Sequence, residues 1–134
     1  MELVSTNLGL VKEAYQKFIN GDIPAMMELY HEDAVFHYYA PDVSPFAGSY
    51  EGKVGILRFF QMIPENIELF RFEPQEFIDG GDKIVVIGRE GVRSKKTGKT
   101  YEGRFVHVAD VENGKVKSLR LFPDTAGATH IFSD

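Results

Sequence analysis

The stretch that decides the fold is RFVHVADVENGKVKSLRLF, residues 104–122. Two runs of alternating apolar and polar residues flank Asn113 and Gly114, a pattern typical of a β-hairpin. One histidine, His107, lies between apolar neighbours in the middle of the first run. The way this hairpin closes therefore decides whether His107 faces the interior of the protein or the solvent.

Two closures of the hairpin are open, and they differ by one residue of register. A two-residue turn at Asn113 and Gly114 would place His107 opposite Arg120, on a mixed face. The buried set would then be Val106, Val108, Leu119 and Leu121. We prefer a three-residue loop, 112–114, because it separates apolar from charged side chains. It collects an apolar set on one face: Phe105, His107, Ala109, Leu119 and Leu121.

The chain on either side of the hairpin predicts helices first and strands afterwards. Apolar residues at helical spacing predict three helices, over about 4–19, 23–30 and 53–63, the last ending before Pro64. Turn-forming residues predict a loop over 40–52. β-rich runs predict strands at 34–39, 67–78, 83–93, 100–111 and 115–122. This order predicts a single α+β domain over residues 1–134, with the helices on one face of a curved sheet.

Composition and charge exclude several classes of function. A net charge of −5 argues against a nucleic-acid partner, which would need clustered lysine and arginine. No apolar run approaches the ~20 residues of a membrane span, and the start of the chain lacks the features of a signal peptide, so we expect a cytoplasmic protein without a membrane role. The absence of cysteine excludes thiolate chemistry, and His31 and His37 lack the spacing of a zinc helix. We therefore expect no metal and no cofactor.

The strand predicted at 83–93 carries a second ionisable side chain on an apolar face. Alternation puts Glu90 on the same face as Ile84, Val86, Gly88 and Val92, and the arginines on the other. If residues 96–99 close the preceding hairpin symmetrically, Glu90 lies opposite Phe105 and diagonal to His107, with Cα atoms about 7–8 Å apart. Burial raises the pKa of a carboxyl, and each group tunes the other. The two residues are thus predicted to form a pair for general acid–base catalysis.

Three stretches carry a resemblance to a known family: NGDIPAMMELYHEDAVFH at 20–37, PFAGSYEGKVGILRFF at 45–60 and ENGKVKSLRLFPDT at 112–125. They resemble the SnoaL-like and ketosteroid-isomerase-like branch of the nuclear transport factor 2-like superfamily, in register over nearly the whole chain. The resemblance implies three N-terminal helices packed on a strongly curved, mixed but mainly antiparallel sheet. It also implies a cone with an apolar pocket (a cystatin-like α+β roll) and a homodimer formed through the outer face of the sheet.

The catalytic residues of ketosteroid isomerases carry over poorly. Their base matches Tyr38, and their oxyanion-binding tyrosine falls near Ala14, one residue from Tyr15. Their oxyanion-binding aspartate falls at or beside His107. The resemblance therefore implies that steroid isomerase activity itself is not the function.

Two other enzyme types of the family also match in part. The Asp-Arg-Asp set of limonene epoxide hydrolases corresponds to Glu90, Gly88 and Leu121, so a single carboxylate remains. The aspartate that SnoaL-type cyclases use near the end of the last strand matches Asp124. A turn or helix cap is the plain structural explanation of Asp124, because Pro123 precedes it.

The sequence and the resemblance together predict a cofactor-independent enzyme that acts on a small apolar carbonyl-bearing or cyclic substrate, of isomerase, cyclase or dehydratase type. His107 and Glu90 would move protons, and Tyr38 or Asp124 would orient the substrate. The side chains predicted to line the ligand pocket are Tyr15, Phe18, Phe36, Tyr38, Phe60, Phe105, Leu119 and Leu121. The alternative is a non-catalytic dimeric module that binds a small ligand or serves in assembly.

Overall fold

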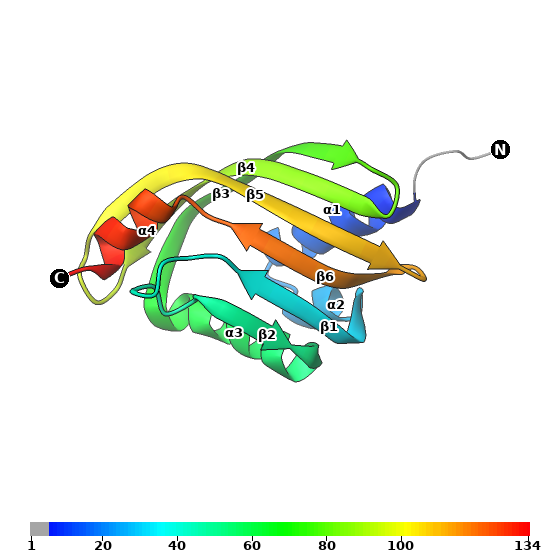
Figure 1. Ribbon diagram of the computed structural model, residues 1–134, viewed down its shortest axis with the longest axis horizontal. Coiled ribbons are helices and arrows are strands. Elements are labelled where there is room, and N and C mark those ends of the chain that lie inside the picture. The colour runs from blue at the N-terminus through cyan, green and yellow to red at the C-terminus, as the bar shows by residue number, and fades with distance from the viewer. Residues whose placement is uncertain (1–5) are drawn as a thin grey trace.

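A six-stranded mixed sheet forms the centre of the protein, whose computed structural model describes residues 6–134. The helices are α1 (Thr6–Ile19), α2 (Ile23–Met27), α3 (Gly52–Asn66) and α4 (Thr125–Phe132). The strands are β1 (Tyr30–Tyr38), β2 (Gly48–Glu51), β3 (Ile67–Asp79), β4 (Lys83–Ser94), β5 (Thr100–Glu112) and β6 (Lys115–Phe122). Their spatial order is β2-β1-β6-β5-β4-β3, with β1 and β6 parallel and all other neighbours antiparallel. The predicted α+β class is confirmed, and Figure 1 shows how strongly the long strands bend.

The first two helices differ from the prediction at their ends. The helix predicted over 4–19 is described from Thr6 onward, and positions 4 and 5 lie outside the described residues. The second helix ends at Met27, and Tyr30 begins β1 instead of continuing the helical stripe. The Tyr30 ring packs edge-on against Phe36 of the same strand, with centroids 5.4 Å apart. The packing of Tyr30 on Phe36 thus places Tyr30 in the strand, although its spacing from Met26 and Met27 fits a helix.

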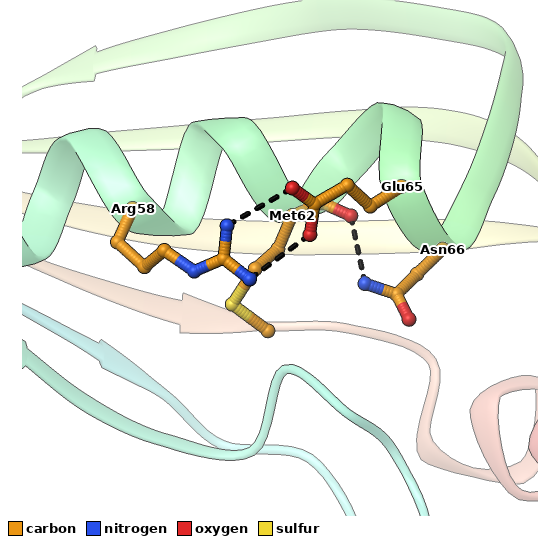
Figure 2. A network of polar contacts seen from close by, with 4 residues as sticks. All are labelled: Arg58, Met62, Glu65 and Asn66. Carbon is orange, nitrogen blue, oxygen red and sulfur yellow. Dashed lines mark hydrogen bonds and ion pairs between the residues drawn. The ribbon is translucent and has the colours of Figure 1, made fainter.

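The third helix continues past Pro64 to Asn66, where the sequence predicted its end. Proline lacks the N–H that would bond one turn back, so other contacts must stabilise the last turn. Figure 2 shows them: the guanidinium of Arg58 donates two hydrogen bonds to the carboxylate of Glu65 (3.0 and 2.9 Å), and Asn66 Nδ2 donates to the carbonyl of Met62 (2.9 Å).

Two short elements, β2 and α4, were not among the predicted ones. β2 pairs with β1 inside the segment predicted as a loop. α4 packs on the bent part of β5, at the end of the sheet opposite the β5–β6 turn (Figure 1). Ile131 of α4 is fully buried, and the carbonyls of Ile131 and Ser133 accept hydrogen bonds from Thr97 Oγ1 and Lys99 Nζ. Tertiary contacts thus stabilise a helix too short to be stable alone.

The β5–β6 hairpin combines features of both predicted closures. A two-residue turn closes it, with Asn113 and Gly114 at φ of 51° and 76°, so the predicted three-residue loop is wrong. The pairing then shifts by one residue, which leaves Lys117 as a β-bulge on β6. As a result His107 pairs with Leu121 and not with Arg120. The apolar face that the three-residue loop predicted is buried: Phe105, His107, Ala109, Leu119 and Leu121.

Candidate functional site

An apolar cavity of about 90 Å³ lies between the helices and the concave face of the sheet. Seven of the eight predicted ligand-binding residues line it: Tyr15, Phe18, Phe36, Tyr38, Phe60, Leu119 and Leu121. Phe105 is buried behind this lining, where its ring stacks on Phe72 and on His107 with centroids 5.0 and 4.4 Å apart. Apart from tyrosines, the ionisable side chains among the described lining residues are Glu90 and His107. Of the three predicted catalytic residues, Glu90 and His107 thus line one aromatic cavity, whereas Asp124 does not.

Glu90 and His107 do not form the predicted diagonal pair. Glu90 pairs with Gly103, and His107 pairs with Val86, so the two lie four residues apart along the sheet, about 13 Å. The predicted register is wrong because residues 94–99 form a longer connection, closed by the hydrogen bond from Ser94 N to Lys99 O. The ring of Phe105 occupies the space between, above Gly88, where an added Cβ would lie 2.5 Å from the ring.

His107 is hydrogen-bonded to Tyr15 of α1, with 2.5 Å between Nδ1 and the phenol oxygen. Burial lowers the pKa of His107 to about 3. Burial, and to a smaller extent the charges of Tyr30 and Glu90, raise the pKa of Tyr15 well above its ordinary value. At neutral pH both rings are therefore uncharged. Either Tyr15 donates to Nδ1 and Nε2 carries the ring proton, or Nδ1 donates and the phenol proton is free for another acceptor.

The other ring nitrogen of His107, Nε2, has no hydrogen-bond partner among residues 6–134, and His107 is one of the residues that line the cavity. Tyr30 and Tyr38 also line the cavity, and neither hydroxyl has a hydrogen-bond partner among the described residues. Such groups are arranged to receive a polar ligand atom or water.

Glu90 presents a carboxyl group to the same cavity from β4. Its side chain is almost fully buried, and Tyr101 donates a hydrogen bond to Oε2 (3.2 Å). Burial raises the pKa of Glu90 to about 7; the bond from Tyr101 lowers it and the nearby charge of Asp124 raises it. The second oxygen, Oε1, has no hydrogen-bond partner within residues 6–134, and Glu90 is one of the residues that line the cavity. Glu90 can therefore both release and accept a proton near neutral pH.

Asp124 lies beside this carboxyl group but outside the cavity lining. It is the N-cap of α4, because its Oδ1 accepts a hydrogen bond from Gly127 N (2.9 Å). Its other oxygen lies so close to β5 that a Cβ on Gly103 would be 2.6 Å from it. Gly103 thus makes room for Asp124 next to Glu90. The structure gives Asp124 the role of a helix cap that acts on Glu90 through its charge.

Sequence reasoning missed two tyrosines of the site. Tyr101, which bonds Glu90, has the same parity on β5 as Phe105 and His107, so strand alternation alone could have found it. Tyr30 lines the cavity, but the prediction placed it in a helix. Its signal was hidden because the helical stripe of α2 continues in phase up to the first residue of β1.

Comparison with known proteins gives consistent matches. The family described as SnoaL-like domain matches residues 11–119. An NTF2-like protein of unknown function from Burkholderia pseudomallei K96243 shares 29% identity over 98% of this chain and 100% of its own, with a TM-score of 0.85. TerC, co-crystallised with polyporic acid, shares 26% identity over 97% and 100% of the two chains, with a TM-score of 0.79.

A more distant match and two negative findings complete the comparison. A candidate isomerase from Bacillus subtilis shares 21% identity over 98% of this chain and 96% of its own, with a TM-score of 0.78, a likeness of fold. None of the curated proteins matches the chain. In the part of the chain that the structure describes, no helix is long and apolar enough to cross a membrane.

Proposed function

Because the chain belongs to the SnoaL-like domain family, which has a fold of isomerase and cyclase type, we propose that it is a cofactor-independent enzyme for a small apolar carbonyl-bearing or cyclic substrate. One observation carries the proposal: the buried carboxyl group of Glu90, a residue that lines an aromatic cavity, has one oxygen held by Tyr101 and the other without a partner among the described residues. The similarity to TerC supports a small-molecule ligand, since TerC was co-crystallised with polyporic acid.

The proposed chemistry is proton transfer at a carbon next to a carbonyl group. Glu90, as carboxylate, takes the proton from this carbon through Oε1 and leaves an enolate. The phenol of Tyr38 lies in the same lining and keeps its proton, because burial and the charge of Glu90 raise its pKa. It donates a hydrogen bond to the enolate oxygen. For a β,γ-unsaturated carbonyl substrate, Glu90 then returns the proton to the γ-carbon of the dienolate, which moves the double bond into conjugation with the carbonyl group and restores the carboxylate.

The uncharged pair of Tyr15 and His107 has a separate part in this proposal. It presents one donor to the cavity, either the phenol O–H or Nε2–H. Because His107 lies about 13 Å from Glu90 along the sheet, the pair binds a second polar atom of the substrate or its far end and does not exchange protons directly with Glu90. Asp124 tunes the carboxyl group from outside the cavity.

Exchange of deuterium into a simple ketone tests the proposed base. In heavy water the wild-type protein is expected to speed the incorporation of deuterium next to the carbonyl group of cyclohexenone, followed by proton NMR. Glu90→Gln keeps the shape of the side chain and its bond from Tyr101 but loses the base, so the rate should fall at least about a hundredfold. Since only the carboxylate acts, the wild-type rate should rise with pH and level off above about pH 7.

A glutamate outside the cavity provides the control. Glu76→Gln, at an exposed position of β3, should leave the exchange rate unchanged. An unchanged rate in Glu90→Gln, at intact fold by circular dichroism, would refute the role of Glu90. If no ketone exchanges faster with wild-type protein than without it, the alternative of a non-catalytic ligand-binding or assembly module is favoured.

We also propose that the protein forms a homodimer through the outer face of the sheet. Tyr39 and Phe122 are exposed there (47% and 40%) and stack on each other with centroids 4.8 Å apart, and exposed Val106 pairs with Phe122. Solvent-exposed aromatic side chains of this kind are typical of interfaces. Phe122→Asp is expected to weaken the dimer at least about tenfold, measured by light scattering over a concentration series. Val54→Asp, on α3, should not change it; a wild-type monomer at all concentrations would contradict the proposal.

A further inference from the structure

A second apolar hollow lies on the surface between α2 and α3. Its volume is about 670 Å³, and its walls include Ile23 and Met27 of α2 and Val54, Leu57 and Phe60 of α3. Val54 is 86% exposed and Leu57 39%, although both are aliphatic. An apolar hollow that a protein leaves open to solvent commonly marks a binding site. We call this hollow the α2–α3 groove.

Phe60 separates the α2–α3 groove from the cavity. It is the side chain that lines both spaces among the described residues. Within the core its ring packs against Phe18 and Phe36, each with centroids 5.7 Å apart. On α2 the neighbouring methionines divide in the same way, since Met26 lines the cavity and Met27 the groove. Phe60 and the two adjacent methionines thus lie where the two linings meet, and methionine side chains adapt easily to a ligand.

The cavity alone is smaller than the usual binding site for an organic ligand. The cavity measures about 90 Å³. Sites for organic ligands commonly measure about 300–1,000 Å³. The cavity and the α2–α3 groove together fall in this range. An unbranched chain that passes beside Phe60, the residue common to both linings, would reach from the cavity into the groove.

We propose that the ligand is a linear amphiphile whose carbonyl head lies in the cavity near Glu90 and whose unbranched alkyl chain passes Phe60 into the α2–α3 groove. The proposal rests on the proposed function for the place of the head group. The apolar wall of the groove contributes affinity in proportion to the length of chain it covers. Ligands with the same carbonyl head should therefore bind more tightly as their alkyl chain becomes longer.

A series of methyl n-alkyl ketones, from pentanone to decanone, tests this inference by titration calorimetry. For the wild-type protein the dissociation constant is expected to fall about 3- to 4-fold for each added CH₂, the effect of burying one methylene. Val54→Asp and Leu57→Asp place a charge in the groove, so they should abolish this gain for the longer ketones and leave pentanone binding unchanged. Val43→Asp is the matched control, because Val43 is an exposed valine (42%) outside both linings.

Three results would overturn the inference. The first is a dissociation constant that does not depend on chain length in the wild type. The second is a chain-length gain that survives in Val54→Asp and Leu57→Asp. The third is a concentration-dependent dimer that Val54→Asp disrupts, because a second copy would then occupy the groove. Failure of the proposed reaction is distinguishable: a normal chain-length gain without deuterium exchange in any ketone would remove the reaction and support the binding inference.

Discussion

Replacing His107 by asparagine is expected to remove on the order of 5 kcal/mol of acid destabilisation between pH 7 and pH 3. The folded protein holds the pKa of His107 at about 3, below its ordinary value of 6.5, because burial disfavours the charged ring. Between these two values the unfolded chain binds a proton that the folded chain does not. The free energy of unfolding therefore falls as the pH falls through this range, and this contribution is complete above about pH 6.5.

Urea unfolding followed by circular dichroism at several pH values measures this effect. His107→Asn keeps an acceptor for the phenol of Tyr15 but cannot be charged by a proton, so the difference between wild type and variant isolates His107. The free energy of unfolding of the wild type minus that of His107→Asn should fall as the pH is lowered. It should level off near pH 3. His130→Asn, at an exposed histidine of α4, is the control for loss of an imidazole. A difference that stays constant with pH would show that His107 is not held neutral by burial.

Glu90→Gln is expected to have the opposite effect, on the order of 3 kcal/mol between pH 4 and pH 8. Burial raises the pKa of Glu90 from 4.5 to about 7, so the folded chain binds a proton in this window that the unfolded chain has lost. Stability from this group is complete below about pH 4.5 and is lost as the pH rises through 7. The variant should gain stability relative to the wild type over the same range, because glutamine has no charge to bury.

The same unfolding series gives the measurement, with Glu76→Gln as the exposed control. If the difference in unfolding free energy between the wild type and Glu90→Gln is the same at pH 4 and pH 8, the pKa of Glu90 is not shifted by burial. From pH 4.5 to 6.5 the contributions of Glu90 and His107 have opposite signs. The wild type should therefore vary little in this window, while each single variant shows the slope of the group that remains.

Strand alternation predicted much of the sheet, because one face of it is buried. The inward set on β4 and β5 was readable from the sequence, and it included both Glu90 and His107. The pairing between strands was not, because register depends on turns and bulges. One skipped residue, Lys117, and a connection longer than expected at 94–99 changed the partners of both groups. A face is a local property of a strand, whereas a register is a property of two strands and the loop between them.

For the site, too, the sequence predicted which residues face inward but not which of them contact one another. Most lining residues were named correctly because aromatic side chains on inward faces have few other places to go. The bond between Tyr15 and His107 joins α1 to β5, and nothing in the local sequence of either element encodes it. Asp124 was chosen by resemblance, and its closeness to Glu90 depends on α4, an element that the pattern of apolar residues did not reveal.

The parallel pairing of β1 with β6 sets the order in which the protein can fold. These two strands come from opposite ends of the sequence, and between them they supply Tyr38 and Leu121 to the cavity. The side of the cavity that β1 and β6 build cannot form until β6 has been synthesised. Topologies dominated by such distant contacts fold slowly, since a long loop must close before its contacts are made. During synthesis the aromatic face of the unfinished sheet stays exposed, and the nascent chain should bind chaperones for apolar segments until β6 is complete.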